Sequence, residues 1–386
     1  MKKTFYSLLK DKNLIFYPAV TQYSNLGDIV IGRTLLSELR SHGHLIIIDR
    51  DVSDTVLKRM NIDNFERLSH FTSLPILIFI VIIALYRLFN PSLKTFYVVT
   101  PGHRFSPPNT FLGMVFELCV RLNESFRLAA LRLFKVRICQ LGLSIGPLSR
   151  IGGWFERLRR HFMYFYSVRE SASAKFLGTI GIENVDFFPD FGWLSIEGEK
   201  SDVRSPKKEV IFSFRESTHS CSERAGYEDS LYEVLDPIVR HLTEKGFSIL
   251  VTFQVALDEP IAQRIYQRYR SNSAVKYHPK QIDEDTLALY SNAAFIVSNR
   301  LHAMIFGAKR GAVPVPLVNT DDHLKIVGIF KDLGLEYLML NLQAGPTEAN
   351  KIQYALEHPE QIAKHIANYV EEQRIVADQT LNEIFA

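Results

Sequence analysis

The stretch from Ala293 to Leu317, AAFIVSNRLHAMIFGAKRGAVPVPL, predicts a buried strand, a tight polar turn, a helix and a second buried strand. The turn carries Asn299, Arg300 and His302, so a cation and an imidazole follow directly on a strand end. In α/β proteins such a turn lies at the carboxyl edge of the sheet, where a helix N-terminus offers free N–H groups and a partial positive charge. The stretch therefore indicates an α/β fold with an anionic substrate and proton transfer at this edge.

The same alternation of apolar strands and helical patterns runs along the whole chain. A strand over 13–20, a helix over 28–43 and a strand over 44–50 form a unit that implies parallel pairing. Helices are also predicted over 231–246, where Pro237 suggests a kink or a break, and over 283–293. Further strands are predicted over 95–103, 137–146, 165–170, 185–190, 209–217, 248–255, 275–279, 295–299 and 312–318.

The chain divides in the middle. Its 386 residues are too many for one ordinary core, and residues 195–209 are polar and rich in Gly, Ser, Pro and charge, as expected of a linker. We expect a first α/β domain over 1–197 and a second over 206–386, with a cleft between them that holds the active site. The helical pattern from Pro359 to Ala386 could pack back on the first domain.

Composition restricts the class of protein. The chain has 47% hydrophobic and 23% charged residues and a net charge of +3, which argues against a nucleic-acid partner. The basic stretches 121–137 and 157–160 are predicted to be solvated helix faces, with an acidic surface or a lipid as the alternative partner.

The three cysteines, Cys119, Cys139 and Cys221, form no CxxC pair, which disfavours a disulfide framework or a zinc site and fits a reducing cytoplasm. The first twenty residues carry no uninterrupted apolar run, so we predict no signal peptide.

Residues 74–86, LPILIFIVIIALY, are apolar throughout and are followed by Arg87. Thirteen residues are fewer than the roughly 18 to 20 that span a bilayer, so a transmembrane helix is disfavoured. Two interpretations stay open for the wider 74–90 segment. It is either a buried helix or strand–helix pair, or a helix that lies in one membrane leaflet.

Two loops near the N-terminus carry candidate site residues. In 23–32, Asn25 and Gly27 suit a tight turn, and Asp28 either caps the following helix or receives a proton from a sugar hydroxyl. The loop has no GxGxxG and no P-loop pattern. In 100–105, Gly102 permits close backbone approach, and His103 and Arg104 are predicted to point into the same sheet edge.

Three arginines, Arg169, Arg215 and Arg300, each follow a predicted strand. Their convergence would hold a small polyanion, because each charge-assisted bond contributes about 1.5–3 kcal/mol. Asp190, also at a strand end, either orients an arginine or caps a turn. HExxH, GxSxG and DxD are absent near these loops, so metal and hydrolase chemistry are disfavoured, and we expect no cofactor.

Five motifs together resemble the polysaccharide pyruvyl transferase family in order and spacing. The resemblance covers about residues 23–340, and the loop 100–105 departs from it because a more glycine-rich loop is expected there. The motifs are NLGD (25–28), GLSIGPL (142–148), SVRESASAKFL (167–177), PD (189–190) and SNRLHAMIFGAKRGAVPV (298–315).

The resemblance implies two Rossmann-like domains in a GT-B-like architecture, the first on the acceptor side and the second on the donor side. It implies transfer of the pyruvyl group of phosphoenolpyruvate to two hydroxyls of a sugar, as a cyclic ketal, in the biosynthesis of an exopolysaccharide or a capsular polysaccharide. Arg169 matches the family's SVRE arginine, and Arg300, Leu301 and His302 match its RLH motif, which is associated with phosphoenolpyruvate binding. Lys325 follows DDH (321–323) in the family's pattern, after the strand that carries the prolines.

As a hypothesis for the mechanism, Arg169 and Arg300 hold the donor anion, His302 protonates the methylene carbon and Asp28 is the base. Arg215, Asn25, Gly27, His103 and Asn299 complete the predicted substrate site. The acceptor could be lipid-linked, which would place the protein in the cytoplasm at the inner face of the membrane. Two alternatives stay open: a glycosyltransferase that uses a nucleotide sugar, and a non-catalytic membrane-surface subunit of a polysaccharide assembly complex.

Overall fold

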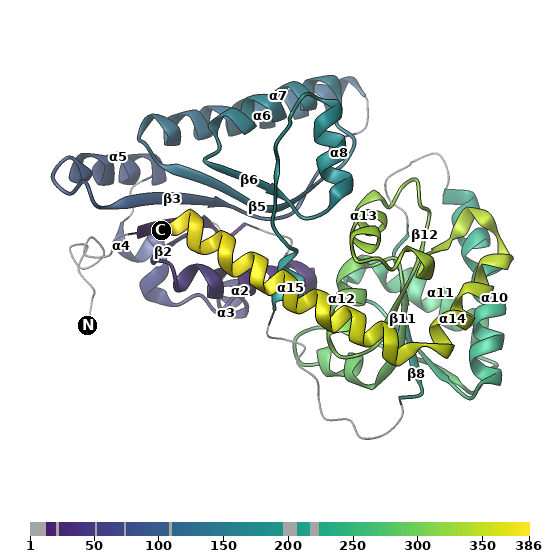
Figure 1. Ribbon diagram of the computed structural model, residues 1–386. Helices are drawn as coiled ribbons and strands as arrows, with labels where there is room; N and C mark the ends of the chain where they lie inside the picture. Colours follow the sequence, from purple (N-terminus) through teal and green to yellow (C-terminus); the bar gives the residue numbers. More distant parts are fainter. Residues whose placement is uncertain are drawn as a thin grey trace. The chain divides into compact units, whose positions relative to one another are not determined.

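The computed structural model describes residues 13–20, 23–50, 52–72, 75–107, 110–195, 207–216 and 224–386, the first two of the last range as backbone only. It forms two compact units (Figure 1). Unit 1 comprises Met1–Gln22, Ile29–Phe191 and Arg374–Ala386, and unit 2 comprises Tyr23–Asp28 and Gly192–Gln373. The first twelve residues, most of the predicted linker, Ser217 and Cys221 lie outside the described ranges, and so does most of the segment considered for a signal peptide.

Unit 1 contains a parallel sheet with the strand order β2-β1-β3-β5-β6-β7, in which β4 pairs with β5. The parallel pairing predicted from the first strand–helix–strand unit is confirmed by the β1–β2 register. The strands are β1 (Asn13–Pro18), β2 (His44–Ile48), β3 (Lys94–Val99), β4 (His103–Arg104), β5 (Arg137–Ile145), β6 (Phe165–Val168) and β7 (Asp186–Phe187).

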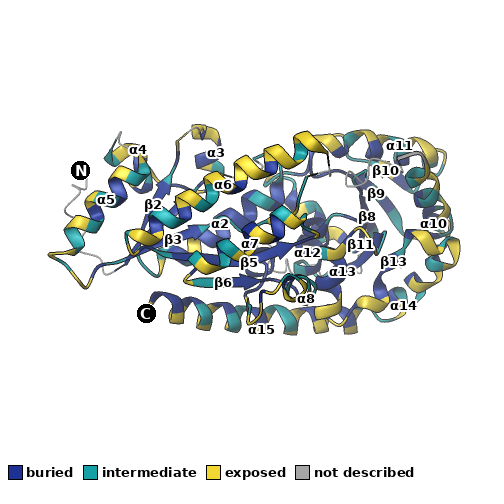
Figure 2. Ribbon diagram, turned by 90° about the horizontal axis from the view of Figure 1, so that it is seen from above, coloured by how far each residue is buried: buried dark blue, intermediate teal, exposed yellow. Residues whose placement is uncertain are grey.

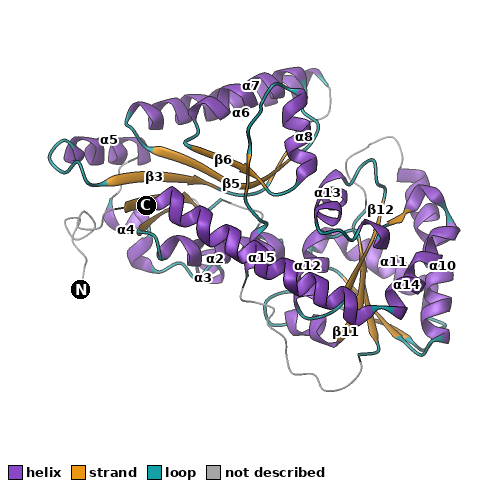
Figure 3. Ribbon diagram, in the orientation of Figure 1, coloured by secondary structure: helices purple, strands orange, loops and turns teal. Residues whose placement is uncertain are grey.

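Helices cover both faces of this sheet. Helices α6 and α7 lie over one face and α2 lies on the other, and the strands run between them (Figure 3). The helices are α2 (Leu26–Arg40), α3 (Asp54–Arg59), η1 (Asn64–Glu66), α4 (Leu68–Phe71), α5 (Ile76–Arg87), α6 (Phe111–Leu133), α7 (Arg150–Phe162) and α8 (Ser171–Thr179). The short α9 (Phe191–Leu194) begins at the last residue of the range Ile29–Phe191 of unit 1 and continues in unit 2.

Within the apolar segment 74–86, residues from Ile76 onward form α5, so a helix is confirmed for the part that the structure describes. Its Phe79, Ile80 and Ile83 pack into the core of unit 1 together with Leu128 and Leu131 of α6. Burial of this face stabilises the unit, since each large apolar side chain contributes about 1.5–3 kcal/mol. Within the described ranges, no helix combines the length and the apolar composition that a bilayer crossing requires.

Residues 121–133 of the basic segment 121–137 lie in α6 and Arg137 begins β5, but the expected solvated face is wrong for part of the helix. Arg127 and Arg132 are exposed as predicted, whereas Arg121 is buried. Arg121 pairs with Glu117, four residues earlier on the same helix (3.5 Å), and donates to the Phe105 carbonyl of the preceding loop (3.4 Å). The contact with the loop cannot be read from the amphipathic pattern of one helix.

The last part of the chain belongs to both units. Helix α15 (Pro359–Phe385) begins in unit 2 and ends in unit 1. Its end is tied to the first strand, because the Asn13 side-chain amide donates to the carbonyl oxygens of Phe385 (2.7 Å) and His42 (3.0 Å). The Phe385 ring packs on Phe96 and stacks on His42.

Unit 2 contains a second parallel sheet with the order β10-β9-β8-β11-β12-β13. The chain builds outward from β8 to β10 and then returns to the other side of β8 with β11, so the direction of build-up reverses between β8 and β11. The strands are β8 (Glu209–Ser213), β9 (Ser248–Thr252), β10 (Val275–Tyr277), β11 (Ala293–Ser298), β12 (Val313–Val318) and β13 (Leu340–Asn341).

Two helix predictions in unit 2 need correction. The helix around Pro237 continues without a break, with Glu233, four residues earlier, on the exposed side, where water can reach the unpaired carbonyl. Residues 287–292 form a 3₁₀ helix instead of an α-helix. The Asp283 carboxylate accepts bonds from the backbone N–H (3.0 Å) and hydroxyl (2.7 Å) of Thr286, which favours a turn.

The remaining elements of unit 2 connect its strands and close the unit. They are α10 (Arg224–Glu244), η2 (Ala256–Asp258), α11 (Glu259–Tyr269), η3 (Leu287–Asn292), α12 (Leu301–Lys309), α13 (Leu324–Asp332), η4 (Glu336–Leu338), η5 (Leu342–Ala344), η6 (Pro346–Asn350) and α14 (Lys351–Glu357).

Candidate functional site

The candidate site of unit 2 lies at the carboxyl ends of β8 and β11. These strands are neighbours, with Ser213 opposite Ser298, and their ends coincide with the reversal of strand order. The Ser298 hydroxyl donates to the Ser213 carbonyl and accepts from the backbone N–H of Arg300 (2.8 Å). Ligands bind at such switch points in open α/β sheets, because the two chains leaving the edge diverge there.

Asn299 fixes the loop that follows β8. Its side chain accepts from the Arg215 N–H (2.8 Å) and donates to the Arg215 carbonyl (2.9 Å) and to the Tyr227 hydroxyl (2.8 Å). Asn299 is only 1% exposed. The hydroxyl of its partner Tyr227 is buried too, and this burial raises the pKa of the Tyr227 hydroxyl. The geometry therefore gives Asn299 the role of holding Arg215 beside Arg300.

Two guanidinium groups and one carboxylate meet at this point. Arg300 donates to Asp258, which follows β9 on the same sheet edge and is 2% exposed. Burial raises the pKa of Asp258 although Arg300 acts in the opposite direction. Burial and the charge of Arg300 together lower the pKa of Arg215.

The cluster has unused polar capacity. Within the described residues, Nε of Arg215, Nε of Arg300 and Oδ2 of Asp258 are buried and have no hydrogen-bond partner. Buried polar groups are normally paired. In the described part of this site, the two guanidinium groups of Arg215 and Arg300 lie beside the single carboxylate of Asp258. An anionic ligand would supply both the missing acceptor and the missing charge.

His302 occupies the second position of α12, next to this cluster. It is 9% exposed and its ring stacks on Phe306 at 6.0 Å. Residues 23–28, a short turn that leads into the first turn of α2, belong to the same unit and pack against His302. A Cβ built on Gly27, the second residue of α2, would lie 2.3 Å from Nδ1 of His302. Asn25 directly precedes α2 and accepts from the Gly27 N–H (3.1 Å). Asp28 is the third residue of α2, so the predicted capping role of Asp28 is wrong.

Two further predicted residues lie in the same unit. Leu301, the first residue of α12, is buried at 3% exposure and serves the core. Lys325 lies half-buried in the first turn of α13, which follows β12, the strand next to β11.

The third arginine, Arg169, belongs to unit 1. It is 5% exposed, its Nε donates to the Ser144 hydroxyl (2.6 Å), and Nη1 contacts Asp190 (2.5 Å). Asp190 has two predicted roles, and the structure supports the first: its carboxylate pairs with Arg169 and orients that guanidinium group. A second carboxylate, Glu170, lies 3.6 Å from Nε. Arg169 is thus neutralised inside its own unit, and its convergence with Arg215 and Arg300 stays a prediction.

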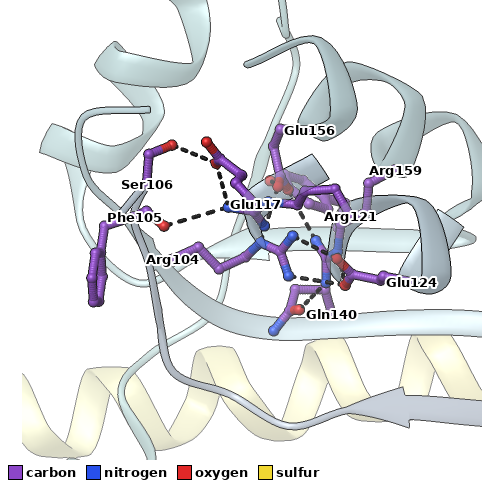
Figure 4. A network of polar contacts seen from close by, with 10 residues as sticks. Arg104, Phe105, Ser106, Glu117, Arg121, Glu124, Gln140, Glu156 and Arg159 are labelled. Atoms are coloured by element: carbon purple, nitrogen blue, oxygen red, sulfur yellow. Dashed lines mark hydrogen bonds and ion pairs between the residues drawn. The ribbon is translucent and has the colours of Figure 1, made fainter. Parts of the chain in front are cut away.

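The loop 100–105 is corrected in one respect. His103 is exposed, and its ring centroid lies 5.3 Å from that of Phe105. The prediction that His103 and Arg104 point into the same sheet edge is wrong, because the two side chains point in different directions. Arg104 turns inward, where it donates to Glu156 (3.0 Å) and makes a two-pronged contact with Glu124 (2.9 and 2.8 Å; Figure 4). The substrate role of His103 stays a prediction.

Sequence reasoning missed four residues that shape these sites: Asp258, Tyr227, Ser144 and Glu170. A signal for Asp258 was present, because it follows a predicted strand whose end shares the edge with Arg215 and Arg300. Among the residues that the structure describes, no group of three or more His, Cys, Asp or Glu side chains is placed to hold a metal ion.

Comparison with solved structures shows the fold class. A glycosyltransferase from Rickettsia africae ESF-5 has a TM-score of 0.57 at 11% identity, over 97% of this chain and 97% of that chain. A UDP-GlcNAc 2-epimerase from Neisseria meningitidis, solved with UDP-GlcNAc, has a TM-score of 0.51 at 14% identity, over 92% and 93%. These similarities confirm a GT-B-type α/β fold with two parallel sheets.

No curated protein sequence matches the chain. The model of the family described as polysaccharide pyruvyl transferase matches residues 25–320, a range that includes the turn at Gly27, both arginines of the unit 2 cluster and His302. By this match the chain belongs to the polysaccharide pyruvyl transferase family, and it is a transferase.

Proposed function

We propose that this protein transfers the pyruvyl group of phosphoenolpyruvate to two hydroxyls of a sugar, forming a cyclic ketal and releasing phosphate. The observation that carries the proposal is the pair Arg215 and Arg300, two guanidinium groups beside one carboxylate at the switch point of the unit 2 sheet. Phosphoenolpyruvate carries a carboxylate and a phosphate, and planar guanidinium groups bind both kinds of group bidentately.

His302 is the proposed general acid. It donates a proton to the methylene carbon of the donor, which leaves a cationic centre at the adjacent carbon. The backbone of Gly27 against its ring restricts the imidazole to one position, and restricted geometry favours proton transfer.

Asp28, one residue after Gly27, is the proposed base for the first sugar hydroxyl. That hydroxyl attacks the cationic carbon and loses its proton, the C–O bond to phosphate breaks, and the second hydroxyl adds with loss of its own proton. Arg215 and Arg300 stabilise the departing phosphate.

The roles of Arg169, His103 and Lys325 in donor or acceptor binding belong to this proposal. The acceptor is proposed to be a sugar of a growing exopolysaccharide or capsular polysaccharide, carried on a lipid. Such an acceptor would place the protein on the cytoplasmic side of a membrane.

The direct test measures phosphate release from phosphoenolpyruvate with free and lipid-linked galactose, glucose and mannose acceptors, and detects the ketal by mass. His302→Gln and Arg300→Lys are expected to lower the rate by about 100-fold or more, as loss of a general acid or of a bidentate anion contact does. His358→Gln, a half-buried histidine of unit 2 after α14, is the matched control and is expected to keep the rate. Wild-type rates in both site variants would remove them from the chemistry.

The fold similarity favours one competing function. Because structural neighbours include a glycosyltransferase and a UDP-GlcNAc-bound epimerase, the same arginines could grip the diphosphate of a nucleotide sugar. Thermal shifts measured separately with phosphoenolpyruvate and with UDP-GlcNAc distinguish the two. Stabilisation by the nucleotide sugar alone would overturn the proposal. Absence of turnover with every donor and acceptor tested would favour a non-catalytic subunit.

A further inference from the structure

In the first half of helix α6, apolar side chains are exposed to solvent and charged side chains are buried. Exposed and buried residues alternate along α6 (Figure 2). Its exposed side is apolar, while Glu117 and Arg121 face the interior of unit 1 at 3% and 8% exposure. No exposed charged residue interrupts α6 between Phe111 and Leu122. The exposed apolar residues, at 36% to 79% exposure, are Phe111, Leu112, Met114, Val115, Phe116, Leu118, Val120 and Leu122.

A polar network beneath α6 fixes this orientation (Figure 4). Glu117 accepts from the hydroxyls of Ser106 (2.6 Å) and Ser149 (2.7 Å), and one turn further on Arg121 lies 3.5 Å from it. Glu124 pairs with Arg104 at 2.8 Å. Rolling the helix to bury its apolar side would break these contacts and leave buried charges without partners, which is strongly unfavourable. The apolar face is therefore a stable outward feature of unit 1.

Neighbouring helices enlarge the apolar surface. The outer side of α5 exposes Ile78, Ile82 and Leu85 at 47%, 37% and 57%, and α5 contacts α6. Helix α7 packs along α6 and exposes Trp154 at 53%. An apolar patch of this kind on a folded chain marks an interaction surface.

The charges around the patch identify its partner. Residues 75–164 contain twelve Lys and Arg but three acidic residues, and all three acidic side chains pair with arginines beneath the helices. The exposed charged side chains of the segment, such as Arg127, Arg132 and Arg157, are therefore basic. A surface that joins bulky apolar side chains to basic ones matches an anionic lipid surface.

We propose that the exposed face of α6, with the outer side of α5, docks this protein on an anionic membrane, with the helix axis in the plane of the headgroups. The apolar side chains enter the boundary with the acyl chains, and the arginines contact lipid phosphates. A second copy fits this face less well, because pairing two identical patches would bring the basic side chains of both together. The inference rests on α6 and does not depend on the proposed reaction.

The test is flotation of the full chain with vesicles of phosphatidylcholine alone or with about 30 mol% phosphatidylglycerol. Wild-type protein is expected to float with the anionic vesicles only, and less as salt is raised from about 0.05 to 0.5 M. The triple variant Phe111→Ser, Leu112→Ser, Phe116→Ser is expected to lose about tenfold or more in partitioning, and Arg127→Gln with Arg132→Gln a smaller share. Leu257→Ser, at an 86% exposed leucine of unit 2, is the control and is expected to bind as wild type.

Absence of wild-type binding, or equal binding by the triple variant and the wild type, would overturn the proposal. So would a dimer of the wild type in sedimentation equilibrium that the triple variant loses, since that would assign the face to a second copy. All three substituted side chains are exposed, so urea midpoints are expected to match the wild type. Phosphate release with a soluble acceptor is expected to stay unchanged, so failure here and failure of the proposed reaction are distinguishable.

Discussion

The backbone of Gly27 lies against the imidazole of His302, so close that a Cβ on Gly27 would fall 2.3 Å from Nδ1 and 2.6 Å from Cγ. The two residues are far apart in the sequence, and the contact joins the first turn of α2 to the first turn of α12. A side chain at Gly27 can therefore be accommodated only if the ring moves.

Gly27→Ala is expected to displace His302 and to lower the rate of phosphate release by about 100-fold, because misplacement by about 1 Å suffices for such a loss. Gly226→Ala, in α10 of the same unit, meets no atom within 4 Å and is the matched control. The control is expected to keep full activity and to gain up to about 1 kcal/mol of stability, since alanine favours a helix. Full activity of Gly27→Ala would show that the position of the imidazole does not matter to the reaction.

Asp258→Asn is expected to tighten the binding of inorganic phosphate to unit 2. Among the residues that the structure describes, Asp258 is the carboxylate that pairs with Arg300 and acts on Arg215, so its substitution removes the negative charge with which a bound anion competes. The same change should lower the free energy of unfolding by about 3 kcal/mol, because two buried cations lose their counter-charge. Isothermal titration with phosphate and urea unfolding measure the two effects.

Asp236→Asn serves as the comparison for Asp258→Asn. Asp236 also pairs with an arginine, Arg268, but both side chains are about two-fifths exposed. Exposed pairs contribute about 0–1 kcal/mol, so stability and phosphate affinity should both stay near wild type. Unchanged phosphate affinity in Asp258→Asn would argue against an anion site at the cluster.

Arg169→Lys is expected to destabilise unit 1 by about 3 kcal/mol. A lysine cannot reach the Ser144 hydroxyl and Asp190 from one planar fork, and both partners are buried. Arg157→Lys, at an exposed arginine of α7, is the control and should change stability by less than about 0.5 kcal/mol. Urea unfolding followed by tryptophan fluorescence tests this, and an unchanged midpoint for Arg169→Lys would mean that the ion pair is not a structural element.

Much of the fold follows from local pattern. Apolar runs and polar turns locate the strands on either side of the stretch 293–317, and Arg215 and Arg300 were placed at strand ends because hydrophobicity stops there. Their adjacency is a different matter. It depends on β11 returning to the far side of β8, and strand order is a property of the whole sheet.

The parts that pattern missed depend on contacts between distant residues. Asp258 pairs with Arg300, which is 42 residues away in the sequence, so no local spacing predicts this pair. The orientation of α6 depends on Arg104, 20 residues from Glu124, and on Glu156, 52 residues from Arg104. Hydrophobic periodicity assumes that the apolar side of a helix faces the core, and a buried ionic network reverses that assumption.

The network beneath α6 also predicts how unit 1 responds to acid. Arg104 and Arg159 hold the pKa of Glu124 at about 2 against the opposing effect of burial, compared with an ordinary value of 4.5. A carboxylate with a depressed pKa stabilises the fold above its ordinary pKa, and this contribution is lost as pH falls through the folded value. Unit 1 is therefore expected to lose stability between pH 4.5 and about 2.

Glu124→Gln tests this directly. At neutral pH the variant should be less stable than wild type by about 3 kcal/mol, the equivalent of the pKa depression, and the difference should vanish near pH 2. Arg159 and Arg104 also lower the pKa of Glu156, although burial opposes this. Glu156 is present in both proteins, so it contributes the same dependence of stability on pH to each. Glu183→Gln, at an exposed glutamate of unit 1, should follow the wild-type curve. Parallel curves for Glu124→Gln and wild type in urea unfolding across this pH range would show that Glu124 is not the group that titrates.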